Sequence, residues 1–156
     1  MVELPYLTPQ YLFALTALVL LVVDTIVPWS RRNDLLAGIA TVGSLAVAGT
    51  SAWFLAAGTG LQPYVPEVFA GMLVVDQMSL FFTFIFGSVA ALVVVASYDY
   101  LEGQANLAEY YALVILAATG MSLMAVANNL ATVFVSLELA SLPSYGLVAY
   151  LKTDKG

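Results

Sequence analysis

The chain has 156 residues, of which 62% are hydrophobic and only 9% are charged. Soluble domains contain roughly 45–50% apolar and about 25% charged residues, so we exclude a surface that faces water throughout and expect an integral membrane protein. Four Lys and Arg against ten Asp and Glu leave no basic patch for nucleic acid. The absence of Cys excludes a disulfide scaffold and a thiol-based metal site, and without His the common nitrogen ligand of metals is also missing.

Long apolar stretches define the expected helices. A helix needs about 20 apolar residues to cross the hydrocarbon core of a bilayer. The stretches of this kind are, approximately, 11–29, 35–57, 77–98, 110–127 and 130–151. They predict an all-α integral membrane fold of about five transmembrane helices in one membrane domain, 1–156, which we expect to be incomplete. Asp76 directly precedes the third stretch and is expected to cap that helix.

The few basic residues predict an orientation in the cell membrane. Arg31 and Arg32 lie between the first and second spans, whereas Lys152 and Lys155 follow the fifth. With alternating spans, both positions fall on the same side, and the positive-inside rule places that side in the cytoplasm. We therefore expect a multi-pass protein with its N-terminus outside and its C-terminal tail cytoplasmic.

Glu138 is the first candidate for a functional side chain. It lies eight residues into the fifth span, about 12 Å along the helix axis and close to the middle of the bilayer. A carboxylate at this depth costs at least roughly 2.5–3.5 kcal/mol on insertion scales, and such groups often serve ion or proton transfer. The alternative is a protonated Glu138 that hydrogen-bonds between helices and serves packing only.

Pro143 follows Glu138 by five residues and is expected to kink the fifth span. Ser141 and Ser144 flank the proline, where their hydroxyls can satisfy freed carbonyls or bind water. One interpretation is a hydrated bend beside the acidic group. The other is an ordinary proline kink that shapes packing, and the sequence leaves both open.

Asp24 is the only other acidic residue inside an apolar stretch away from its start. It lies seven residues before Arg31, within about two helical turns of the cytoplasmic interface. Charges near helix ends are less costly than charges at the bilayer centre. We therefore favour a structural role for Asp24 over a functional one.

The fifth span carries a motif that resembles a known family. The stretch 129–150, with its core Leu-Glu-Leu-Ala-Ser-Leu-Pro at 137–143, is similar to subunit N of the proton-pumping NADH-quinone oxidoreductases, respiratory complex I. Subunits L and M and the multisubunit sodium/proton antiporters tend to place a Trp before the Glu. The segments 75–82, 100–103 and 109–113 follow in the family's order and spacing, so the resemblance covers essentially the whole chain.

The resemblance implies a fold and a role. The chain would be the N-terminal part of an antiporter-like fold with two inverted repeats of five helices, and its last two spans would begin the first repeat. Glu138 matches the family's proton-transferring Glu, whose Lys partner lies on a later, broken helix. The chain would act with other membrane subunits in the bilayer as a translocase subunit without its own redox centre, cofactor or metal, and quinone would be handled elsewhere in the complex.

Two alternatives belong to other classes. The first is a subunit of a multisubunit monovalent cation/proton antiporter. Co-purification with redox subunits would argue against this alternative. The second is a structural membrane module without transport. This second alternative predicts that a neutral substitution of Glu138 changes stability only.

Overall fold

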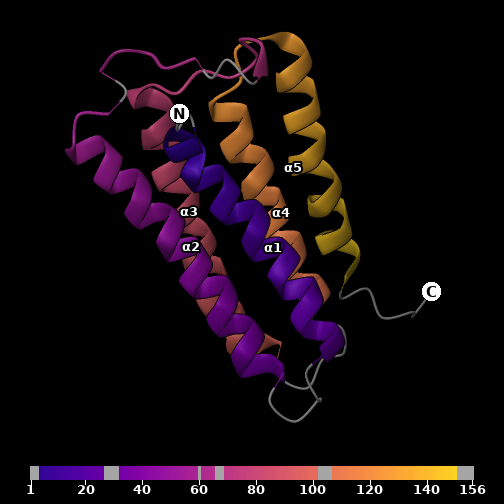
Figure 1. The fold of residues 1–156 in the computed structure, drawn as a ribbon. Helices are drawn as coiled ribbons and strands as arrows, with labels where there is room; N and C mark the ends of the chain where they lie inside the picture. Colours follow the sequence, from indigo (N-terminus) through magenta and orange to yellow (C-terminus); the bar gives the residue numbers. More distant parts are fainter. Residues whose placement is uncertain (1–3, 27–31, 60, 66–68, 102–106, 151–156) are drawn as a thin grey trace.

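The computed structural model describes residues 4–26, 32–59, 61–65, 69–101 and 107–150 (Figure 1). After a short 3-10 helix at Leu4–Leu7, these residues form long helices with alternating directions. The helices are α1 (Thr8–Ile26), α2 (Arg32–Ala56), α3 (Gln77–Tyr100), α4 (Leu107–Ala125) and α5 (Leu130–Tyr150). Helices suit a bilayer because they satisfy their own backbone hydrogen bonds, which lipid cannot do.

The helices have the dimensions of membrane spans. Among the described residues, four apolar runs, in α2 to α5, are long enough to cross a membrane. These runs are Asp34–Ala56, Gln77–Tyr100, Leu107–Ala125 and Leu130–Tyr150. The apolar run of α1, Thr8–Val23, is shorter. The predicted all-α membrane fold is thereby confirmed.

Some helix starts differ from the apolar stretches in the sequence. α1 begins at Thr8, three residues before the expected start, because Pro9 tolerates the first turn of a helix, where its missing N–H is not needed. α4 begins at Leu107, also earlier than expected, and both Leu107 and Ala108 are buried in the core. The expected end of the first span at Trp29 lies outside the described residues.

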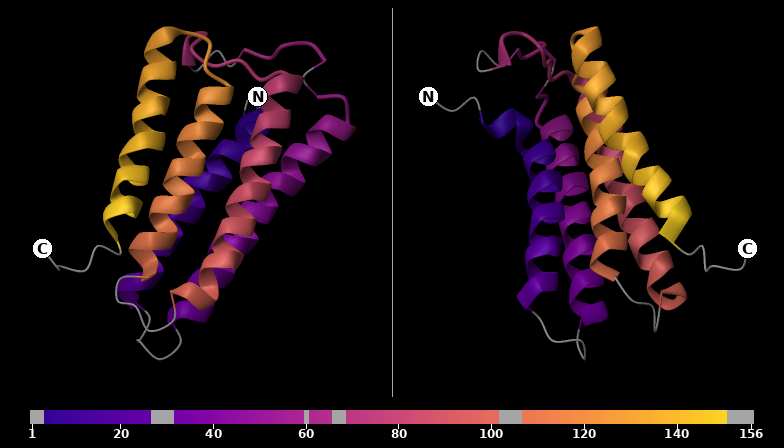
Figure 2. Two further views of the ribbon diagram at one scale, coloured as in Figure 1. Left: turned by 180° about the vertical axis from the view of Figure 1, so that it is seen from behind. Right: turned by 90° about the vertical axis from the view of Figure 1, so that its right-hand side faces the viewer.

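The helices pack as a cluster of four with a fifth at its edge (Figure 2). α2 lies against α1 and α3, and α4 contacts α1, α2, α3 and α5. α5 packs chiefly against α4 and lies on the far side of the cluster from α2. The main hydrophobic core is formed by residues of α1, α2, α3 and α4. It includes the fully buried side chains of Phe13, Leu36, Val94, Tyr111 and Ile115.

At the end of the bundle where α1 begins, the connection between α2 and α3 pairs with itself and with the turn between α4 and α5 (Figure 1). Tyr64 and Val75 form an isolated antiparallel bridge, and Leu73 forms another with Ala127. Val74 N donates to the carbonyl of Val126 at 2.8 Å. The segment before α3 is thereby fixed to the turn between α4 and α5.

Capping residues define the starts of α3 and α5 at this end. Asp76 accepts from Ser79 N at 2.7 Å, while Asp76 N donates to Ser79 Oγ at 2.9 Å. This reciprocal pair is a capping box, so the predicted cap at Asp76 is confirmed. At the start of α5, Asn129 Oδ1 accepts from Thr132 N at 2.7 Å, which permits the short turn after α4.

Candidate functional site

The contact between α4 and α5 sets the orientation of Glu138. A Cβ on Gly120 of α4 would lie only 2.4 Å from Ala140 N, so the two helix backbones are in direct contact there. Ser136 and Pro143 of α5 are buried, and they lie four residues before and three after Ala140, on the same helix face. α5 therefore turns the stripe of Ser136, Ala140 and Pro143 toward α4.

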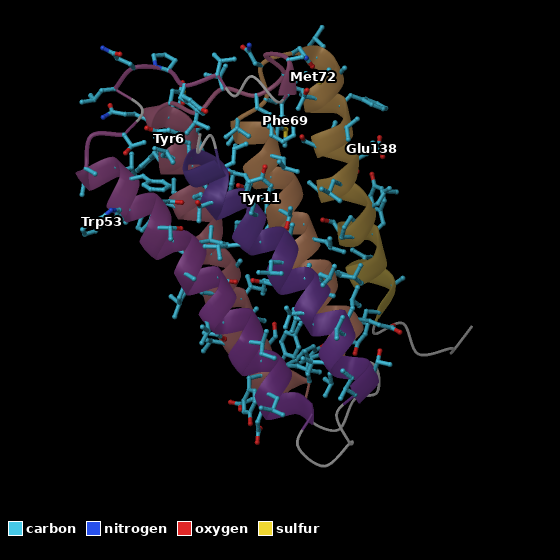
Figure 3. The ribbon with its side chains drawn as sticks, in the orientation of Figure 1. Tyr6, Tyr11, Trp53, Phe69, Met72 and Glu138 are labelled. Carbon is cyan, nitrogen blue, oxygen red and sulfur yellow. The ribbon has the colours of Figure 1, made fainter. Side chains whose placement is uncertain are left out.

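Glu138 lies on the opposite side of α5. It is two residues from both Ser136 and Ala140, a rotation of about 200° around a helix of 3.6 residues per turn. Its neighbours one turn away on the same face are Phe134 and Leu142, which are 62% and 61% exposed. Glu138 itself is half-buried, and Figure 3 shows it on the side of α5 away from the other helices. The carboxylate thus belongs to a mainly apolar, outward stripe.

The basic residues of this chain lie near helix ends or outside the described helices. The four Lys and Arg are Arg31, Arg32, Lys152 and Lys155. Among the described residues, Arg32 is the one of these that falls within a helix, as the first residue of α2. No described helix therefore carries a cation at the depth of Glu138. Any basic partner of this carboxylate would therefore lie outside the described residues.

Two serine hydroxyls bind backbone carbonyls of α5 close to Pro143. α5 runs as one helix through Pro143, whose missing N–H leaves the carbonyl of Leu139 without its usual intrahelical donor. Ser141 Oγ donates to the carbonyl of Glu138 at 3.4 Å, and Ser144 Oγ donates to that of Ala140 at 2.8 Å. The serines therefore bind the carbonyls on either side of Leu139. The structure brings Ser141 next to the backbone of Glu138 and leaves Ser144 exposed.

The remaining predicted site residue, Asp24, is in α1, two residues before that helix ends. Its side chain lies outside the described residues. Within the described ranges, no three His, Cys, Asp or Glu side chains gather as metal ligands.

A buried polar cluster inside the bundle was missed by the sequence analysis. Gln10 Nε2 of α1 donates to Thr83 Oγ1 of α3 at 3.4 Å, and Thr83 Oγ1 lies 3.3 Å from Ser122 Oγ of α4. Hydroxyls in apolar helices usually bond to their own backbone, so Thr83 and Ser122 give no signal. Gln10, an amide just before the first apolar stretch, is the one residue that could have indicated it.

Comparison with known proteins places the chain in a family. No family model matches it. NADH-quinone oxidoreductase subunit N of Dehalococcoides mccartyi is 37% identical over 92% of the chain and 28% of the relative. F(420)H(2) dehydrogenase subunit N of Methanosarcina mazei is 33% identical over 99% of the chain and 31% of the relative. NADH-quinone oxidoreductase subunit N of Desulfitobacterium hafniense is 36% identical, with 97% and 30% covered.

The extent of these matches differs between the chain and its relatives. The similarity covers 92% and 99% of the chain in the first two relatives. The chain spans about three tenths of the length of these relatives, between 28% and 31%. The chain belongs to the subunit N family that these relatives represent.

Proposed function

We propose that the chain is a proton-translocating membrane subunit of an NADH-quinone oxidoreductase-type complex, in which quinone reduction is coupled to proton pumping. The observation that carries this proposal is the position of Glu138, a carboxylate in the middle of α5 on an outward, apolar stripe. The printed names of the relatives support the choice of complex, because they are subunits N of redox enzymes.

A carboxylate in this position can bind and release one proton under the control of a neighbouring charge. Apolar surroundings favour the protonated carboxyl, whereas a cation brought alongside favours the ionised form. We propose that the cation is carried by a helix outside residues 1–156 that covers the outward stripe of α5. Electron transfer in other subunits would move this cation, and Glu138 would load a proton when the cation leaves and release it when the cation returns.

The orientation and partners form part of the same proposal. α1 ends, α2 begins and α5 ends at one end of the bundle (Figure 2), and each of the four Lys and Arg lies within five residues of one of these helix ends in the sequence. The positive-inside rule makes this end cytoplasmic and puts the N-terminus outside. Redox cofactors and the quinone would belong to other subunits, and the outward stripe of α5 would join the rest of the membrane arm.

The test is Glu138→Gln in the assembled complex, measured as proton pumping together with quinone reductase activity. We expect pumping to be lost, because the amide keeps the size of the side chain but cannot take up a proton. Glu109→Gln is the matched control, since Glu109 is an exposed carboxylate in the first turn of α4, and this variant should pump normally.

Other outcomes would favour the alternatives. Unchanged pumping and activity in Glu138→Gln would leave only a structural role for the chain. Sodium-driven proton exchange without any coupled redox activity would instead support a subunit of a cation/proton antiporter.

A further inference from the structure

The polar cluster between α1, α3 and α4 has a defined direction of hydrogen bonding. Thr83 Oγ1 donates its one proton to the carbonyl of Ser79 at 2.8 Å. Thr83 Oγ1 is therefore an acceptor for its other two contacts, from Gln10 Nε2 and from Ser122 Oγ. This assignment fixes the Gln10 amide with its nitrogen toward Thr83, so its carbonyl oxygen points elsewhere in the bundle.

Two buried polar atoms, one of them in this cluster, lack a hydrogen-bond partner in the part of the chain that the structure describes. Gln10 Oε1 and Ser51 Oγ have no hydrogen-bond partner among the described residues. Gln10 is only 4% exposed and Ser51 is fully buried, at 0%. Buried polar groups nearly always have a partner in a folded protein, either from the chain or from an ordered water, so both atoms call for a ligand.

The packing of α2 against α3 places Ser51 at about the same level as Thr83. A Cβ on Gly87 of α3 would lie 2.9 Å from Ala48 N and 3.2 Å from Val47 Cγ1 of α2. From this contact, Thr83 is four residues toward the start of α3, about 6 Å, and Ser51 is three residues beyond Ala48, about 4.5 Å. The helices run in opposite directions, so both steps lead the same way and the two hydroxyls lie at about the same level.

The packing of α1 against α2 gives the same level for Gln10. A Cβ on Gly43 would lie 2.3 Å from Thr16 Oγ1. Gln10 is six residues from Thr16, about 9 Å along α1, and Ser51 is eight residues from Gly43, about 12 Å along the antiparallel α2. Gln10, Ser51 and Thr83 therefore lie in one layer of the bundle, each on a different helix, and Gln10 and Thr83 are in direct contact there.

We propose that Gln10 Oε1 and Ser51 Oγ bind one internal water molecule. A buried water makes about three hydrogen bonds to otherwise unsatisfied groups. The amide oxygen accepts one bond from the water, and the Ser51 hydroxyl donates one to it or accepts one from it. No carboxylate takes part in this cluster, so its neutral oxygen atoms fit a water molecule better than a cation.

The water site is separate from Glu138. Ser122 is two residues from Gly120 in α4, a rotation of about 200°, and Gly120 is the residue in contact with α5. The polar cluster therefore lies on the side of α4 that faces α1 and α3, with α4 between it and the outward carboxylate. The inference does not depend on the proposed function.

The test is an electron-density map of the intact membrane assembly at a resolution that shows internal waters. We expect a peak within about 2.7–3.2 Å of both Gln10 Oε1 and Ser51 Oγ, the range of ordinary hydrogen bonds. A map that shows other internal waters but no peak here would overturn the proposal, and so would a direct bond between the two side chains.

Variants identify the ligands of the water. Ser51→Ala should abolish or displace the peak, as should Gln10→Met, which keeps an unbranched side chain of similar length. Ser44→Ala is the matched control, because Ser44 is equally buried on α2 but its hydroxyl already donates to the carbonyl of Ala40 at 2.8 Å. An unchanged peak in both Ser51→Ala and Gln10→Met would contradict the assignment. If a variant does not fold, the wild-type map decides alone.

Discussion

The adjacent helices α4 and α5 have similar hydrophobic composition but opposite surroundings. In the most apolar part of α4, 61% of the residues are buried, against 11% in α5. α4 contacts all four other helices, whereas α5 packs chiefly on α4 through a single stripe. Composition therefore establishes that both helices belong in a membrane, but only packing determines which of them lies inside the protein.

The exposed side of α5 differs from an ordinary lipid-facing surface in one residue. Phe134 and Leu142 can face acyl chains at little cost, because lipid is as apolar as they are. Glu138, in the same stripe, cannot do so without a large penalty while it is ionised. The contrast with α4 leads us to infer that α5 is an inner helix of a larger assembly, whose outward stripe is completed by another segment.

The largest expected difference between the two helices is in the effect of side-chain truncation. Ile115→Ala removes a fully buried side chain from the core around α4 and should lower the free energy of unfolding by about 2–5 kcal/mol. Leu142→Ala, on the outward stripe of α5, should change it by less than about 0.5 kcal/mol. The measurement is unfolding of the purified chain in detergent. Equal losses for both variants would show that the α5 stripe is already packed in the isolated chain.

The contact between the two helices is expected to be the next most sensitive point. Gly120→Ala places a methyl group 2.4 Å from a backbone nitrogen of α5, which cannot move aside as a flexible side chain would. We expect a loss of about 1–3 kcal/mol in unfolding free energy, typical of overpacking.

A second glycine provides the control for this substitution. Gly49→Ala meets nothing within 4 Å and should stabilise α2 by up to about 1 kcal/mol through helix propensity. The same effect at both positions would mean that α4 and α5 do not approach each other this closely.

The smallest predicted effect concerns the cap of α3, outside the pair of α4 and α5. Asp76→Ala removes the carboxylate that accepts from Ser79 N in the capping box. We expect the free energy of unfolding to fall by about 1 kcal/mol. Asp99→Ala removes an exposed carboxylate from the last turn of the same helix, where a negative charge opposes the helix dipole. The thermal midpoint of the Asp99→Ala variant should stay unchanged or rise slightly. A fall of the same size in both variants would indicate a general effect of charge and not of capping.

The sequence predicted the helices well because their main signal is local. Apolar length identifies a span, and an acidic residue directly before a span, such as Asp76, predicts a cap. The bridges from Tyr64 to Val75 and from Leu73 to Ala127 join distant segments through their backbones. Backbone pairing of this kind does not depend on residue composition, so these bridges were not predicted from the sequence.

The candidate site was only partly predictable for a similar reason. The depth of Glu138 follows from counting along one helix, and its residue type marks it as costly in lipid. The direction in which it points depends on the contact between Gly120 and Ala140, which no single-helix pattern contains. The meeting of Gln10 with Thr83 and Ser122 likewise depends on three helices at once.

The central claim, that the outward carboxylate of α5 meets a cation from another segment, is tested most directly by a structure of the assembled complex in lipid. The account predicts a Lys or Arg nitrogen within about 4 Å of the Glu138 carboxylate, the distance of an ion pair, on a helix that covers Phe134 and Leu142. A Glu138 carboxyl that packs against acyl chains or is surrounded by bulk water, with no basic side chain near it, would contradict the account.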